Sequence, residues 1–105
     1  MGAPQQQRPP LSSEARVSTE MPRRYLAQLC KHFQHKRPVA LAEGHERGRI
    51  EFPGGVCALE AEAETLVMRV SADDEAALAR LEDVVARHLE RFAFRDKLEV
   101  RWVRS

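Results

Sequence analysis

Residues 49–70, RIEFPGGVCALEAEAETLVMRV, decide the fold of this 105-residue chain. Apolar and polar residues alternate over residues 49–52, which is the period of a strand with one buried face, and residues 56–62 predict the next strand. Residues 66–70 predict a further strand of the same sheet. The turn residues Pro53-Gly54-Gly55 join neighbouring strands directly, whereas parallel strands need a crossover of about a dozen residues or more. The stretch therefore predicts an antiparallel sheet.

The sequence before this stretch predicts two more strands and a helix. Residues 15–19 alternate, and residues 39–43 form an apolar run that ends at a turn over residues 44–48. Between them a helix begins at Pro22, where the missing backbone N–H costs little. This helix is predicted to run to about Lys36, because Pro38 forces the preceding residue out of the helical region.

A second helix and a last strand follow the sheet. The sequence SADD at residues 71–74 is typical of a capping box, and acids fill the first turn of the helix while bases fill its last turn. Residues 98–102, LEVRW, alternate and predict a terminal strand with Trp102 buried. The order is β-α-β-β-β-β-α-β. Two amphipathic helices must cover one face of the sheet, so the predicted fold class is α+β, a two-layer sandwich.

The alternation also predicts which strand residues face the helices. They are Ile50, Phe52, Cys57, Leu59, Ala61, Leu66, Met68, Val70, Leu98, Val100 and Trp102. The opposite face is predicted to carry charges of both signs and almost no aromatic residue. Base stacking needs exposed aromatic rings, and phosphate binding needs a basic surface, so nucleic acid is not an expected partner.

Composition limits the remaining classes of protein. Residues 1–13 are rich in Gln, Pro and Ser and are predicted to be a disordered tail, which leaves residues 14–105 as one domain. Lys and Arg total 17 and Asp and Glu total 16, so the net charge of +1 gives no electrostatic reason to bind a membrane surface. No secretory leader or membrane-spanning run is present in the sequence, so we expect a cytoplasmic protein with free thiols.

Four residues are candidates for a metal site. Cys30 and His32 flank the apolar stripe of the first helix, His88 lies inside that of the second, and Cys57 points toward both helices. A tetrahedral site of Cys30, His32, Cys57 and His88 is therefore one interpretation. The other is that the thiols are small buried side chains and the imidazoles bond to backbone carbonyls, since the spacing matches no zinc-binding motif.

The same residues argue against catalysis. His32 lies about 160° round the helix from Cys30 and cannot activate its thiol, and no Gly-rich loop nearby offers oxyanion donors. The sequence thus favours a non-catalytic accessory or binding module over an enzyme. We expect its groove near His32 and His88, with Tyr25 as a third candidate ligand-binding residue. No cofactor is indicated.

Three strings resemble a bacterial family. They are RYLAQLCKHFQHKRPV (24–39), GRIEFPGGVCALEAE (48–62) and ALARLEDVVARHLERFAFRDKLEVRW (77–102). They are similar to the small uncharacterised proteins grouped as domain of unknown function 2218, from about Ala15 to Trp102. The chain departs from this family at Pro53-Gly54-Gly55, where an FPFG-like turn is expected.

The resemblance implies a functional context without naming a catalytic residue. Members of this family occur as short separate chains, and some are joined to siderophore-interacting flavin reductases. A link to iron–siderophore handling is therefore implied, with such a reductase or a small ligand as the partner. The alternative function is transition-metal binding by the Cys/His residues.

Overall fold

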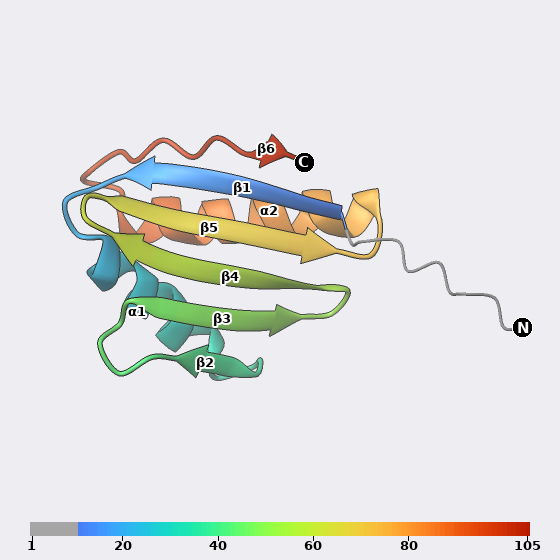
Figure 1. Cartoon of the computed structure of the whole chain (residues 1–105), viewed down its shortest axis with the longest axis horizontal. Coiled ribbons are helices and arrows are strands. Elements are labelled where there is room, and N and C mark those ends of the chain that lie inside the picture. Colours follow the sequence, from blue (N-terminus) through green and yellow to red (C-terminus); the bar gives the residue numbers. More distant parts are fainter. Residues whose placement is uncertain (1–10) are drawn as a thin grey trace, which may run out of the picture.

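The structure, a computed structural model, describes residues 11–105. These residues form six strands and two helices in the order β1 (Leu11–Ser18), α1 (Pro22–Phe33), β2 (Val39–Leu41), β3 (Arg47–Phe52), β4 (Gly55–Glu62), β5 (Thr65–Ala72), α2 (Glu75–Phe92) and β6 (Val103–Arg104). The strands pair in the order β2-β3-β4-β5-β1-β6, and every pairing is antiparallel (Figure 1). The predicted α+β fold and element order are confirmed.

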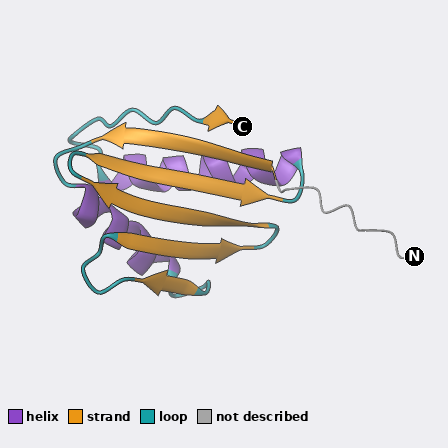
Figure 2. Ribbon diagram, in the orientation of Figure 1, coloured by secondary structure: helices purple, strands orange, loops and turns teal. Residues whose placement is uncertain are grey.

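Both helices lie on one face of the sheet, which makes the second layer of the sandwich (Figure 2). α1 covers β3 and β4, while α2 covers β5 and β1. The inward strand residues predicted from alternation form the floor of this core. Cys57 of β4, for example, is paired with Ile50 on one side and Val70 on the other, and all three are buried. The pattern of alternation therefore set the register of the central strands.

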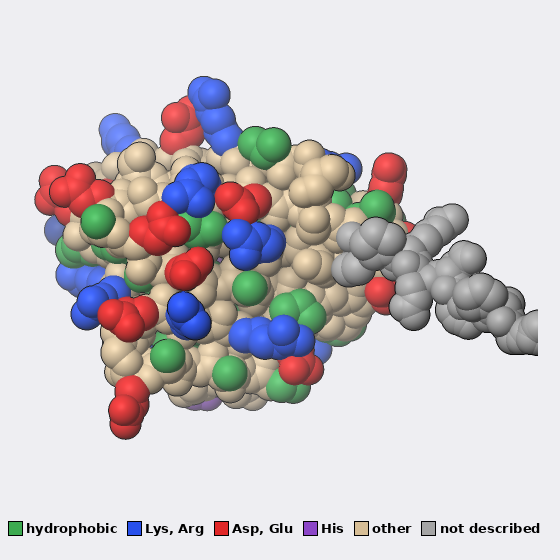
Figure 3. Space-filling model, in the orientation of Figure 1, with side chains coloured by type: hydrophobic (Ala, Val, Ile, Leu, Met, Phe, Trp, Pro, Cys, Tyr) green, Lys and Arg blue, Asp and Glu red, His purple; other side chains and the backbone are tan. Residues whose placement is uncertain are grey.

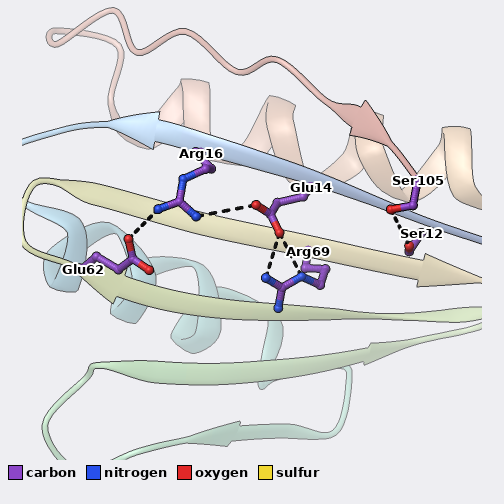
Figure 4. Close-up of polar contacts among 6 residues, drawn as sticks. All are labelled: Ser12, Glu14, Arg16, Glu62, Arg69 and Ser105. Carbon is purple, nitrogen blue, oxygen red and sulfur yellow. Dashed lines mark hydrogen bonds and ion pairs between the residues drawn. The ribbon is translucent and has the colours of Figure 1, made fainter.

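The outer face of the sheet carries interspersed acids and bases (Figure 3). Ion pairs join the strands: Arg69 of β5 contacts Glu14 of the neighbouring β1 at 2.7 Å, and Arg16 of β1 reaches across β5 to Glu62 of β4 at 2.6 Å (Figure 4). The side chains of these pairs are a third or more exposed, so each pair adds little to stability. Together these ion pairs neutralise the outer face of the sheet.

Several predicted boundaries were wrong. The strand predicted at residues 15–19 begins at Leu11, so residues 11–13 belong to β1 and not to a tail; residues 1–10 of that predicted tail lie outside the described residues. α1 ends at Phe33 instead of Lys36, because the Lys36 N–H bonds to the Phe33 carbonyl three residues back and so leaves the α-helical pattern of bonds four residues back.

The largest correction concerns the C-terminus. Residues 98–102 form no strand, and β6 is only the two residues Val103–Arg104, paired with Ser13 and Glu14 of β1. Leu98, Val100 and Trp102 are partly buried against the core. The predicted burial of Trp102 is thus only partial. The alternation was real, but the segment packs through its side chains and not through a full ladder of backbone hydrogen bonds.

The start of α2 lies three residues later than the capping pattern at Ser71 suggested. Asp74 is the N-cap, and its Oδ1 accepts a hydrogen bond from the Ala77 N–H at 2.8 Å. Asp83 and Arg87, one turn apart in α2, form an ion pair at 3.0 Å. Among residues 11–105, no helix has the length and apolarity needed to cross a membrane.

Candidate functional site

A groove lies between α1 and the segment that ends α2. It consists of two pockets of about 510 and 410 Å³ that share Arg24, Gln28 and Phe92 in their walls. The first pocket is completed by Ala27, Lys31, His32 and His45. The second is completed by Met21, Tyr25 and residues 93–96. We call the two together the α1–α2 groove. Its total size suits a small ligand.

The helical period explains why α1 supplies one wall. Arg24, Ala27, Gln28 and Lys31 stand at positions i, i+3, i+4 and i+7, so they share a stripe along the helix. Leu26, Leu29 and Cys30 occupy the stripe that faces the sheet and are fully buried. Burial of that second stripe fixes the helix, and the first is thereby turned toward the end of α2.

Aromatic and imidazole rings gather at the end of the groove where α1 stops. The ring centroid of His32 lies 4.8 Å from His88, 5.0 Å from Phe33 and 5.6 Å from Phe92. Phe33 also lies 4.8 Å from His88. His32 lines the groove, whereas His88 stands behind it, outside both sets of wall residues. The predicted convergence of His32 and His88 is thus observed.

His88 has the partner expected of a histidine in an apolar stripe. Its Nδ1 lies 2.7 Å from the carbonyl oxygen of Val84, one turn earlier in α2. A carbonyl only accepts, so Nδ1 carries the proton and donates. The ring orientation is therefore fixed by the helix itself, and His88 presents a rigid surface to His32 and Phe33.

The groove has a basic environment. Arg24, Lys31, Lys36 and Arg91 form no ion pair with any carboxylate of residues 11–105, unlike the arginines of the sheet face. The pocket that contains Lys31 and His32 has no acidic wall residue. Positive charge therefore exceeds negative charge in the groove, whose one acidic wall residue is Asp96, although the chain as a whole is nearly neutral.

The surroundings of His32 lower the pKa of its imidazole. Its contacts with three rings remove water from one face of the imidazole, and this desolvation lowers its pKa from the usual 6.5. The charges of His88, Lys36, Arg91 and His35 lower the pKa further. The charged groups that act on His32 are thus all cationic or able to become cationic. Their positive charge favours the binding of an anion next to His32.

Tyr25 and Gln28 supply the polar contacts of the groove. The Tyr25 hydroxyl donates to the carboxylate of Asp96, which ties α1 to the turn after α2. Burial and this carboxylate raise the pKa of Tyr25. The Oε1 atom of Gln28 is buried and has no hydrogen-bond partner among the described residues. A buried acceptor left without a partner costs about 1–3 kcal/mol, so a donor on a ligand or a water molecule would be favoured there.

The four predicted metal ligands do not form one site. Cys30 and Cys57 are completely buried in the core, and burial raises the pKa of their thiols to about 11 and about 12. Within the described part of the chain, no three side chains of His, Cys, Asp or Glu are placed to hold a metal ion. His32 and His88 meet, with ring centroids 4.8 Å apart, and no third ligand among residues 11–105 joins them. The thiols serve as small core residues with little tendency to ionise.

Among the wall residues of the groove, the sequence predicted only His32 and Tyr25. Arg24, Gln28 and Lys31 were not selected because solvent-exposed polar residues on a helix are ordinary. Their i, i+4, i+7 spacing was the available signal. His45 falls in the predicted turn over residues 44–48; its backbone φ of 59° is left-handed, and its side chain lines the first pocket. Asp96 gave no signal, since its pairing with Tyr25 spans 71 residues.

Comparison with known proteins agrees with this fold. A family model described as an uncharacterized protein conserved in bacteria (DUF2218) matches residues 14–103. The NMR structure of PA4090 from Pseudomonas aeruginosa is similar, with a TM-score of 0.75 and 40% sequence identity over 89% of this chain and 95% of that one. No curated protein matches.

Proposed function

Since the chain belongs to the uncharacterized bacterial family DUF2218, we propose its function from the groove. The protein is a non-catalytic binding module that holds a small ligand between α1 and the end of α2. The observation that carries the proposal is a groove of ligand size in which rings, unpaired cations and a buried unpartnered acceptor meet. Binding sites combine apolar walls with a few polar groups in this way.

The finer proposal is that the ligand is an iron–siderophore complex, presented to or received from a siderophore-interacting reductase. The resemblance to chains joined to such reductases supports it. The groove is large enough for part of a siderophore complex, and it is open to solvent. A partner reductase would then contact the ligand on its exposed side.

The test is calorimetric titration of the whole chain with ferric complexes of several siderophore classes. Saturable binding that is weakened by His32→Ala or Gln28→Leu supports the proposal. Arg80→Ala on α2 is the control, because Arg80 is an exposed cation that lines neither pocket. Absence of heat and of any shift in melting temperature with every siderophore class would refute the siderophore function.

The alternative function, binding of a transition metal, rests on the pair His32 and His88. Structural metal sites use three or four ligands, and here only two imidazoles meet. The cations near His32 also oppose a divalent ion, since like unit charges about 8 Å apart repel by about 2 kcal/mol at an effective dielectric constant of 20. Elemental analysis of protein purified without chelator decides the point; one metal ion per chain would favour the alternative.

A further inference from the structure

We infer that the α1–α2 groove selects anionic ligands that carry aromatic rings, and among iron–siderophore complexes the catecholate class over the hydroxamate class. This inference rests on the proposed function, because it names the ligand of the same groove. It is drawn from the arrangement of cations and rings around His32.

Paired and unpaired cations lie on different parts of the molecule. On the outer face of the sheet each of Arg16, Arg47, Arg49 and Arg69 lies within 4 Å of a glutamate. In the groove Arg24 and Lys31 have no such partner among residues 11–105, and the charges of Lys36 and Arg91 act on His32. The one carboxylate among the wall residues, Asp96, accepts a hydrogen bond from the Tyr25 hydroxyl and keeps its negative charge. The cations Arg24, Lys31 and Arg95 outnumber it in the walls, so the groove offers an excess of positive charge.

A second feature is the position of the rings. His32 and Phe92 are wall residues, with Phe33 and His88 packed behind them. Planar rings stack on such surfaces, and guanidinium and ammonium groups lie favourably over ring faces. A ferric tris-catecholate complex is a trianion built from three aromatic rings, and so it matches both features. A ferric hydroxamate complex is neutral or cationic and has no ring to stack.

Gln28 lines both pockets, and its Oε1 atom is buried without a hydrogen-bond partner among the described residues. Rotation of this side chain toward the groove would let a ligand amide N–H or phenol O–H satisfy the acceptor. The ligand is thus expected to combine negative charge with a hydrogen-bond donor next to its ring, as the amide-linked catechols do.

The experiment compares three probes by calorimetry on the full chain: ferric enterobactin, ferrioxamine B and iron-free 2,3-dihydroxybenzoate. We expect ferric enterobactin to bind at least about 10-fold more tightly than ferrioxamine B, with an affinity that falls as salt is raised. Arg24→Gln/Lys31→Gln should weaken binding of the catecholate by about 10-fold or more and leave ferrioxamine B unchanged. The control Arg80→Gln/Arg87→Gln removes two cations from α2 outside the groove and should change neither affinity by more than about 2-fold.

The outcomes separate the inference from the proposed function. Equal affinity for the two ferric complexes, or no effect of Arg24→Gln/Lys31→Gln, would overturn the inference and leave a siderophore-binding module. If only dihydroxybenzoate binds, and its binding depends on Arg24 and Lys31 in the same way, the inference is supported. The ligand of the groove would then be an aromatic anion without iron. If none of the three probes binds, both are refuted. A circular dichroism spectrum identical to wild type confirms that each variant is folded.

Discussion

At Gly48 in β3 a side chain is excluded by packing. A Cβ atom there would lie 2.5 Å from Cys30 Sγ and 3.2 Å from Leu26 Cδ2, both fully buried in α1. The contact lets α1 approach the sheet closely. We expect Gly48→Ala to destabilise the protein by about 1–3 kcal/mol, as overpacking does. Chemical denaturation monitored by circular dichroism measures the change.

Two further variants make the cause specific. Adding Cys30→Ala to Gly48→Ala removes the clashing sulfur, so the double variant should lose less stability than the sum of the single changes. Gly44→Ala is the matched control, since its nearest neighbours would be 3.6 Å away on an exposed turn. Equal destabilisation by Gly44→Ala and Gly48→Ala would contradict the packing argument.

The thiols of Cys30 and Cys57 should be unreactive in the folded protein. Both are fully buried, and desolvation raises their pKa to about 11 and about 12, so very little thiolate exists at pH 8. We expect iodoacetamide to label neither thiol over an hour at pH 8 in the native state. Mass spectrometry should show two labels after unfolding in guanidinium. Rapid labelling of the folded chain would mean that α1 opens readily from the sheet.

At the scale of an element, α2 depends on a single cap. The Asp74 carboxylate accepts a hydrogen bond from the Ala77 N–H at 2.8 Å, and it also lies at the positive end of the helix. Asp74→Ala should cost about 0.5–2 kcal/mol of stability, read from a urea transition. Asp73→Ala is the matched control: it removes the neighbouring acid, which does not cap the helix. A larger loss for Asp73→Ala than for Asp74→Ala would disprove the assignment of the cap.

The sequence predicted elements best where one face is fully buried. In β3 and β4 a shift by one residue would expose Ile50 or Leu59, whereas in β5 Val67 is buried as well as Leu66 and Met68. At the C-terminus the same alternation in residues 98–102 was misleading. Burial of alternate side chains needs an extended chain, but a strand also needs a partner edge, and β1 pairs with only Val103–Arg104. Strand pairing depends on the tertiary structure, and the alternation of residues in one segment does not predict it.

On the scale of the whole molecule, a net charge of +1 hides an uneven distribution. The sheet face is neutralised by ion pairs, and the groove side of the helices is not. Composition alone suggested no anionic partner, since it averages the two faces. The fold was predictable from local patterns, but the groove depends on which exposed residues of α1 meet residues 92–96, and those contacts join distant parts of the chain.

The same uneven charge predicts a dependence of stability on pH. The folded-state pKa of His32 lies below 6.5, because desolvation and the charges of His88, Lys36, Arg91 and His35 oppose its protonation. Below 6.5 the unfolded chain therefore binds more protons at this residue than the folded one. The stability contributed by neutral His32 should be present above pH 6.5 and lost as the pH falls from there through the lower folded pKa.

Thermal melts of the wild type and His32→Gln at pH 5 to 8 isolate this contribution, because the other titrating groups are common to both proteins. The melting temperature of the wild type relative to the variant should rise with pH across this range. Raising the salt concentration should reduce the slope without abolishing it, since salt screens the four neighbouring charges but leaves the desolvation of the ring. A difference that falls with rising pH would mean that an acid pairs with His32, and the unneutralised charge of the groove would be disproved with it.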